Sequence, residues 1–259
     1  KGCVMFAGAT PVTVELKAED RFKLKPEQIV NAITDKTKAI IIGYPNNPTG
    51  ATMDYEDYEA IVEVLKDKDI IVISDELYAE LTYEGKHVSI AQFPEMKDRT
   101  IVINGFSKAF AMTGWRIGFA CGPADALEQM KKIHQYALMC SPTTAQYAAI
   151  EALRNGEPEV RRMVEEYDRR RRIMVDGFRK IGLSCFEPIG AFYVFPDIRV
   201  SGLSSDEFCE RLLMQERVLM VPGNSFGACG EGFVRATYAT SIDNIREALV
   251  RIRRFLESL

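Results

Sequence analysis

The stretch Ile-Val-Ile-Asn-Gly-Phe-Ser-Lys-Ala-Phe-Ala-Met-Thr-Gly-Trp-Arg-Ile-Gly, residues 101–118, carries the strongest information on the fold of this chain. It begins with a β-branched run, which is typical of a fully buried strand. Asn104 and Gly105 then end the strand in a turn of small and polar residues. Lys108 lies in that turn. We therefore predict a buried strand with a lysine just beyond its carboxyl end.

Lys108 and Arg116 have side chains suited to complementary chemistry. A lysine among small and apolar neighbours can be partly desolvated, which lowers its pKa and frees the amine to act as nucleophile or base. The planar fork of an arginine binds phosphate oxygens bidentately. A pyridoxal phosphate site needs this pairing of an imine-forming lysine with a phosphate-binding arginine. The stretch alone is equally consistent with a surface lysine and a salt-bridged arginine in an ordinary loop.

Two more strands of buried composition precede this one, and polar residues follow each of them. The segments are Lys38–Tyr44, followed by the loop Pro45–Gly50 with Asn47, and Asp69–Ser74, followed by Asp75 and Tyr78. Strands that alternate with helical crossovers predict an α/β fold with a mainly parallel sheet, wrapped by helices on both faces. Ligands of such sheets bind beyond the carboxyl ends of the strands, where these polar residues would gather.

The second part of the chain has a different pattern. Apolar residues recur at helical spacing from Glu157 to Lys180, and shorter elements follow from about Leu183. We expect strands at 190–196, 218–221 and 233–238, and helices at 26–33, 54–65, 146–153, 204–216 and from Ser241 to the end. This predicts a large domain over 1–155, and an interdomain helix with a smaller α+β domain over 156–259.

Several segments are expected to be structural only. Residues 4–16 suggest an edge strand or hairpin. The run Arg169–Arg172 is predicted to be a solvated helix face paired with Glu165 and Glu166, rather than a nucleic-acid patch. Trp115 is expected to pack, and the two histidines, His87 and His134, to be structural.

Composition excludes several functional classes. A net charge of −4 over 259 residues argues against general nucleic-acid or membrane-surface binding, and no apolar run is long enough to span a bilayer. Six scattered cysteines with only two histidines favour reduced thiols in a cytoplasmic protein, without a disulfide framework or a metal site. The start at Lys1, without an initiator methionine, suggests that upstream sequence is absent.

Five segments, in order, resemble one family. They are Tyr-Pro-Asn-Asn-Pro-Thr-Gly at 44–50, Ser-Asp-Glu-Leu-Tyr at 74–78, the stretch 105–118, Pro-Gly-Asn-Ser-Phe-Gly at 222–227 and Phe-Val-Arg at 233–235. Together they resemble the class I and II aminotransferases, pyridoxal phosphate enzymes of fold type I. The nearest branch looks like the bacterial and archaeal aspartate and aromatic aminotransferases. The resemblance covers essentially the whole chain.

The resemblance implies roles for residues around the cofactor, pyridoxal 5'-phosphate. Lys108 would form the internal aldimine and later move a proton between the substrate α-carbon and the cofactor. Asp75 would pair with the pyridine nitrogen and keep it protonated, so that the ring accepts electrons. Tyr78 and Asn47 would hydrogen-bond the ring oxygen.

The resemblance also implies two anion sites. Arg116, with Ser107, would hold the phosphate, and Arg235, assisted by Asn47, would bind the substrate α-carboxylate. Many relatives carry a hydroxyl three residues before the lysine, where this chain has Gly105, which removes one phosphate contact. The parts of the family that cup the phosphate, stack on the ring and reach across the dimer interface would lie upstream.

Each of these residues also has a purely structural interpretation. Asn47 could form a turn, Asp75 a helix cap and Arg235 a surface ion pair; Tyr78 could be a core aromatic and Ser107 a plain turn residue. The implied function is amino transfer between an L-amino acid and a 2-oxo acid in a homodimer with shared active sites. The alternatives are a carbon–sulfur lyase or synthase on the same fold, or a catalytically silent truncated fragment.

Overall fold

A four-stranded sheet organises the first part of the computed structural model, which describes residues 1–259. The strands are β1 (Ala39–Gly43), β2 (Ile71–Asp75), β3 (Thr100–Gly105) and β4 (Gly118–Cys121), in the order β1-β2-β3-β4. The first three run parallel, as predicted. β4 is antiparallel to β3 and was not predicted, because Gly-Phe-Ala-Cys lacks the β-branched run that marks the others.

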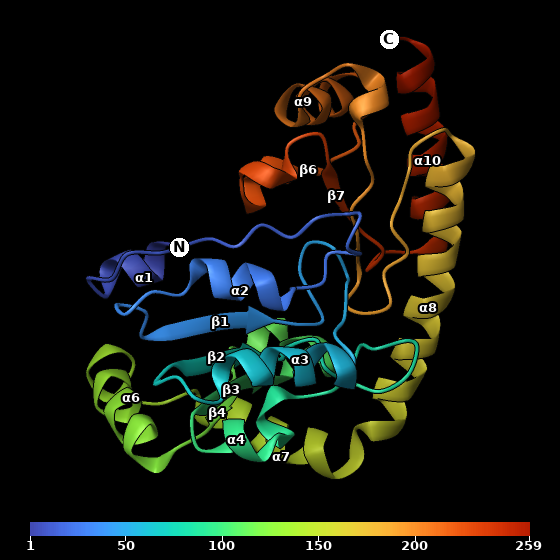
Figure 1. The fold of residues 1–259 in the computed structure, drawn as a ribbon. Coiled ribbons are helices and arrows are strands. Elements are labelled where there is room, and N and C mark those ends of the chain that lie inside the picture. The colour runs from blue at the N-terminus through green and yellow to red at the C-terminus, as the bar shows by residue number, and fades with distance from the viewer.

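Helices cover one face of this sheet closely. α2 (Pro26–Ala32), α3 (Tyr55–Leu65) and α4 (Pro94–Lys97) supply the apolar side chains that pack against Ile42 and Val72 (Figure 1). On the opposite face, Ile41 and Ile71 are 59% and 42% exposed, and α6 (Ala124–Ala137) buries none of its residues. The prediction that helices wrap both faces is therefore met fully on one face only, because β1 and β2 leave apolar side chains exposed on the other.

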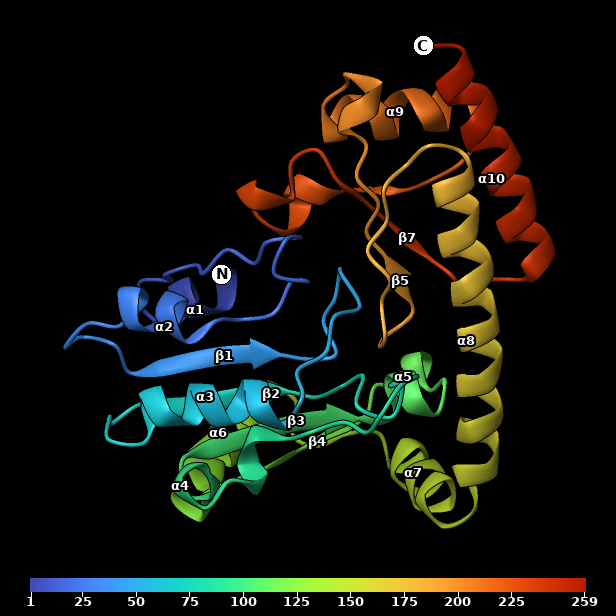
Figure 2. The same ribbon diagram turned by 45° about the vertical axis from the view of Figure 1, so that its right-hand side comes forward.

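The second part of the chain has its own small sheet and core. α7 (Thr143–Asn155) leads into α8 (Glu157–Lys180), which runs along one side of the molecule from the first part to the second (Figure 2). The small sheet is antiparallel in the order β5-β7-β6, formed by β5 (Tyr193–Val194), β6 (Val221–Pro222) and β7 (Val234–Thr237). α9 (Ser205–Glu216) and α10 (Ile242–Glu257) pack with α8 around a separate hydrophobic core. These two cores support, as a proposal, the domain division at 155/156.

Short helical turns complete the chain. They are the α-helical turns α1 (Gly2–Phe6) and α5 (Phe106–Ala109), and the 3-10 turns η1 (Ile90–Gln92), η2 (Thr113–Trp115), η3 (Arg199–Ser201), η4 (Gly223–Phe226) and η5 (Ala228–Gly230). None of the helices combines the length and apolar character that a membrane crossing requires.

Helix starts agree with the capping signals in the sequence. Asp54 accepts a hydrogen bond from the Asp57 amide at 2.9 Å and opens α3, which ends at Leu65 as predicted. Ser204 and Ser241 cap α9 and α10 in the same way, each at 3.2 Å. The predicted strand bounds were less accurate. Strands were predicted at 190–196 and 218–221, but the structure has only the two-residue strands β5 and β6 there.

The expected edge strand at 4–16 is wrong. Residues 2–6 form α1 instead, and no regular structure follows as far as residue 16. A strand requires a hydrogen-bonded neighbour, and no segment of the chain pairs with these residues.

The arginine run on α8 is solvated only in part. Arg169 and Arg170 pair with Glu166, and Arg172 pairs with Asp168. Arg171, predicted to be solvated with the others, is 1% exposed and donates to the Pro188 carbonyl at 2.7 Å. Consecutive residues on a helix are about 100° apart, so a run of four must turn at least one side chain toward the interior.

Candidate active site

The carboxyl ends of three strands bring the predicted site residues to one edge of the sheet. In the sheet register Gly43 of β1 lies beside Asp75 of β2, and Asp75 lies beside Ile103 of β3. The loops that follow these ends carry Asn47 and Lys108. Asn47 and Lys108, 61 positions apart in the sequence, thus follow strands that end at the same edge of the sheet.

Asn47 and Arg235 meet across the two parts of the chain. Arg235, on β7, donates from Nη1 to Oδ1 of Asn47 at 2.8 Å. The loop of Asn47 is fixed in place at Gly50, which has φ +72° and where a Cβ atom would lie 2.3 Å from the Cβ of Pro188. Glycine is required there on both counts.

The Arg235 guanidinium lies between two aromatic rings. Its Cζ atom is 4.5 Å from the ring centroid of Tyr193 and 4.8 Å from that of Phe226. No carboxylate of the chain forms an ion pair with it, in contrast to most arginines on α8. The surface ion-pair interpretation of Arg235 therefore fails, and the charge remains available for a carboxylate ligand.

Lys108 projects from the one-turn helix α5 into an aromatic setting. Its Nζ atom is 5.5 Å from the ring centroid of Tyr78 and 5.6 Å from that of Phe192, and no carboxylate pairs with it. Three residues earlier, a Cβ on Gly105 would lie 3.0 Å from the Cα of Gly118 in β4. The close approach of β3 and β4 leaves little room for a side chain at Gly105, the position where many relatives carry a hydroxyl.

Tyr78 is held by a second tyrosine. The hydroxyls of Tyr78 and Tyr193 are 3.0 Å apart, and both side chains are buried. Burial raises the pKa of Tyr78 well above its usual value. Tyr78 therefore keeps its proton at neutral pH and can act as a hydrogen-bond donor.

Asp75 has an exposed carboxylate, although it lies between two buried residues. Its Oδ1 atom accepts a hydrogen bond from the Leu77 amide at 3.2 Å. Ser74 and Glu76 point to the other face of the sheet, where Glu76 also accepts from Ser89 at 2.6 Å and lies 2.8 Å from Nε2 of His87. This buried network was missed in the sequence, apart from the structural role of His87.

The two predicted phosphate ligands lie on adjacent turns. Ser107 is in the only turn of α5, and Arg116 follows η2 with φ +53°. Nη1 of Arg116 donates to the Thr113 carbonyl at 2.7 Å, and the rest of the guanidinium is exposed. Trp115 does not pack as expected but is 47% exposed, because the η2 turn lies at the surface.

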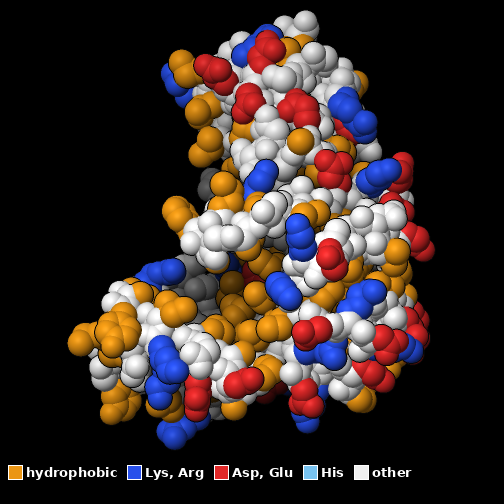
Figure 3. Space-filling view, turned by 60° about the vertical axis from the view of Figure 1, so that its left-hand side comes forward, with side chains coloured by type: hydrophobic (Ala, Val, Ile, Leu, Met, Phe, Trp, Pro, Cys, Tyr) orange, Lys and Arg blue, Asp and Glu red, His pale blue; other side chains and the backbone are white.

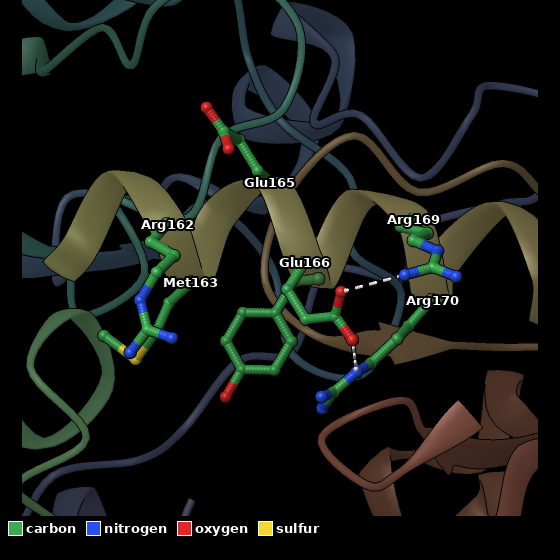
Figure 4. A pocket seen from close by; sticks show the side chains of 7 residues that line it. Arg162, Met163, Glu165, Glu166, Arg169 and Arg170 are labelled. Carbon is green, nitrogen blue, oxygen red and sulfur yellow. Dashed lines mark hydrogen bonds and ion pairs between the residues drawn. The ribbon is translucent and has the colours of Figure 1, made fainter. Parts of the chain in front are cut away.

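The surface is hollowed between the two parts of the molecule, and hydrophobic side chains line much of the hollow (Figure 3). A separate open pocket of about 640 Å³ lies along α8 and includes none of the predicted site residues. In it Glu166 bridges Arg169 and Arg170, while Glu165 points away from both (Figure 4). Glu166, and not Glu165, is thus the partner of Arg169 and Arg170.

Comparison with known proteins identifies the class. The fold is that of the fold type I transferases. The family model described as aminotransferase class I and II matches residues 1–252. This chain belongs to the class I and II aminotransferase family, whose members depend on pyridoxal phosphate, and the predicted fold class is confirmed.

Individual relatives are similar over nearly all of the chain. A Bacillus subtilis protein named as an aminotransferase, YugH, is 53% identical over 253 residues, which are 98% of this chain and 66% of that protein. An aspartate aminotransferase of Pyrococcus abyssi is 44% identical, with the same two coverages. The chain thus spans about two thirds of the length of the curated relatives that it matches.

Solved structures agree with the fold. The aromatic aminotransferase of Pyrococcus horikoshii superposes with a TM-score of 0.96 at 44% identity, covering 98% of this chain and 69% of that one. The Thermus thermophilus aspartate aminotransferase with maleate gives a TM-score of 0.90 at 42% identity, covering 97% and 65%.

Proposed function

We propose that the whole protein is a pyridoxal phosphate-dependent aminotransferase that moves the amino group of an L-amino acid to a 2-oxo acid. The observation that carries the proposal is the position of Lys108, whose amine has no acidic partner and faces two aromatic rings. It projects from the same sheet edge as Asp75 and the Asn47–Arg235 pair.

The residues present fit the cofactor. Bound pyridoxal phosphate supplies an aldehyde that an amine can attack and a ring that accepts electrons. Lys108 would provide the amine, and the exposed carboxylate of Asp75 would hold the ring nitrogen in its protonated form. Tyr78 would donate its retained proton to the ring oxygen, alongside the amide of Asn47.

The phosphate and the substrate would be held by arginines. Arg116 has guanidinium donors beyond the one bound to Thr113, and Ser107 adds a hydroxyl on the adjacent turn. Arg235 would bind the substrate α-carboxylate with donors not used by Asn47, and the rings of Tyr193 and Phe226 would keep its fork in one plane. Lys108 would then move the proton at the substrate α-carbon, because it is the only amine of this set.

The same proposal covers the substrates, the assembly and the cellular location. The substrates are small molecules, an L-amino acid and a 2-oxo acid, and the assembly is a homodimer with shared active sites. All six cysteines are unpaired, which supports a reducing, cytoplasmic location. Two similar proteins are named as aspartate and aromatic-amino-acid aminotransferases, which supports amino transfer over a carbon–sulfur lyase or synthase.

Borohydride reduction of the whole protein tests the proposal. Reduction should fix the cofactor to the peptide that carries Lys108, as mass spectrometry of the digest would show. Lys108→Ala should lose this label and at least about a thousandfold in kcat, since both nucleophile and proton carrier are removed. Lys132→Ala, on the exposed helix α6, serves as the matched control and should keep both.

Three results would contradict the proposal. A reducible label retained in Lys108→Ala would assign the chemistry to another lysine. Continuous release of ammonia and pyruvate from an amino acid alone, without a 2-oxo acid, would favour the lyase. A whole protein that binds no pyridoxal phosphate would favour the catalytically silent fragment.

A further inference from the structure

We propose that Tyr193 is a positioning residue that couples the carboxylate-binding arginine, Arg235, to the hydroxyl of Tyr78. The inference rests on the proposed function of the site. Tyr193, on β5 of the small sheet, contacts Tyr78, which follows β2 of the large sheet.

Tyr193 contacts both partners directly. It begins β5, and its Cα is paired with Thr237 of β7, two residues from Arg235. Its ring lies under the Arg235 guanidinium at 4.5 Å, and its hydroxyl is 3.0 Å from that of Tyr78. The two tyrosine rings meet edge to face, with centroids 5.9 Å apart and planes at 72°.

The direction of the hydroxyl bond follows from the charges nearby. A cation over an aromatic ring is stabilised by electron density in that ring, and a phenol gains electron density when its hydroxyl donates. The Arg235 cation therefore favours Tyr193 as the donor and Tyr78 as the acceptor. With this direction the proton of Tyr78 is not used within the pair and can be donated to an anionic oxygen in the cleft.

The backbone around Tyr193 holds the side chain in register. The Ala191 amide donates to the Leu81 carbonyl at 2.9 Å, which ties this segment to the chain just after Tyr78. The Tyr238 amide donates to the Phe192 carbonyl at 3.1 Å, which ties it to the end of β7. Tyr193 is thus fixed from both sides, so that a shift of Arg235 on carboxylate binding would be felt at Tyr78.

Three variants of the whole holoenzyme separate the contributions of the hydroxyl and the ring. Tyr193→Phe removes the donor but keeps the ring, and Tyr193→Leu removes both. Tyr44→Phe is the matched control, since Tyr44 is also a buried tyrosine whose hydroxyl donates, at 2.8 Å, to the Phe22 carbonyl outside the site. The two readouts are the pH titration of cofactor absorbance and the kcat and KM for L-aspartate, L-glutamate and L-tyrosine.

The hydroxyl and the ring should affect different quantities. Tyr193→Phe should raise the midpoint of the absorbance titration by about 0.5 to 1 pH unit, since a weaker donation from Tyr78 leaves the ring oxygen less stabilised as an anion. Tyr193→Leu should in addition raise KM about threefold to thirtyfold through loss of the stacked ring, with a smaller change in kcat. Tyr44→Phe should change neither quantity.

The failures are distinguishable. A midpoint in Tyr193→Phe equal to that of wild type, or an unchanged KM in Tyr193→Leu, would overturn the coupling while the proposed function stands. A wild-type protein without cofactor absorbance would overturn the proposed function and the coupling with it.

Discussion

Glu76 shows how one residue can support a neighbour that it does not touch. Asp75 and Glu76 are adjacent, yet the pleat of β2 sends Asp75 into the open edge and Glu76 into the interior, where it is 5% exposed. Burial acts to raise the pKa of Glu76, but hydrogen bonds with His87 and Ser89 outweigh it and hold the pKa below its usual value. Glu76 is therefore charged, and its buried hydrogen bonds hold in place the end of the strand that carries Asp75.

Glu76→Gln should destabilise the whole protein by about 1 to 3 kcal/mol at pH 7, because it replaces a well-bonded buried carboxylate. A folded-state pKa below the unfolded value of about 4.3 means that the charge stabilises the fold above that pH. The difference between wild type and Glu76→Gln should shrink as pH falls through the folded pKa. Urea unfolding between pH 7 and pH 3 measures it; a difference that is constant with pH would show that Glu76 is neutral in the fold.

Residue-level prediction from the sequence succeeded where a motif is contiguous. Lys108, Asp75 and Asn47 each follow a recognisable strand, so their shared edge could be predicted. The proposed role of Tyr193 could not be predicted, because it depends on contact with Tyr78, a partner 115 residues away in the sequence. The roles proposed for Arg116 and Ser107 still rest on the family resemblance.

At the scale of elements, local signals were the most reliable. α3, α9 and α10 begin at the predicted caps because a cap satisfies backbone amides within its own turn. β5 and β6 are shorter than predicted because a strand extends only over residues that pair with a neighbouring strand. β7 pairs with two residues of each of them. The helix α1 replaces an expected strand for the same reason.

At the start of α3, the stabilisation from the helix cap can be measured separately from the stabilisation from the charge of Asp54. Asp54 caps the helix and accepts a hydrogen bond from Lys23 at 2.8 Å. Partial burial acts to raise its pKa, but the bonds from Lys23 and the Asp57 amide lower it to about 2. Its charge therefore stabilises the fold above the unfolded pKa of about 3.9, and this contribution is lost as pH falls toward 2.

Asp54→Ala should cost about 1 to 2 kcal/mol at pH 7, while Asp54→Asn, which keeps an N-cap, should cost only a few tenths. On acidification toward pH 2 the Asn variant should converge with wild type, and the Ala variant should remain less stable. Thermal or urea unfolding at several pH values checks this. Equal losses in both variants at pH 7 would assign the whole effect to the Lys23 pair.

At the scale of the molecule, α8 connects the two parts through a buried charge. Arg171 donates to Pro188, binds Asp168 and Glu84, and lies 5.3 Å from the Tyr83 ring centroid. Burial acts to lower the pKa of Arg171, but the bonds to Asp168 and Glu84 raise it above its usual value. The loop at Pro188 packs in turn on Gly50 in the loop of Asn47, so the long helix helps to set the position of one wall of the site.

The open face of the large sheet leads to a prediction for these 259 residues produced as a protein. Ile41 and Ile71 lie on that face, and Ile133 and Tyr136 of α6 are 72% and 95% exposed. Contiguous exposed apolar surface binds hydrophobic dyes. We expect strong enhancement of anilinonaphthalene sulfonate fluorescence under native conditions.

Two variants test whether the sheet face is the source of the dye binding. Ile41→Thr with Ile71→Thr should reduce the enhancement and change the free energy of unfolding by less than about 1 kcal/mol, since both side chains already meet solvent. Val72→Thr, on the covered face and 0% exposed, should leave dye binding in place and cost about 1 to 3 kcal/mol by burying a hydroxyl. Weak dye binding by the unmodified chain would show that this face is covered in solution, and self-association measured by sedimentation would then identify a second copy as the cover.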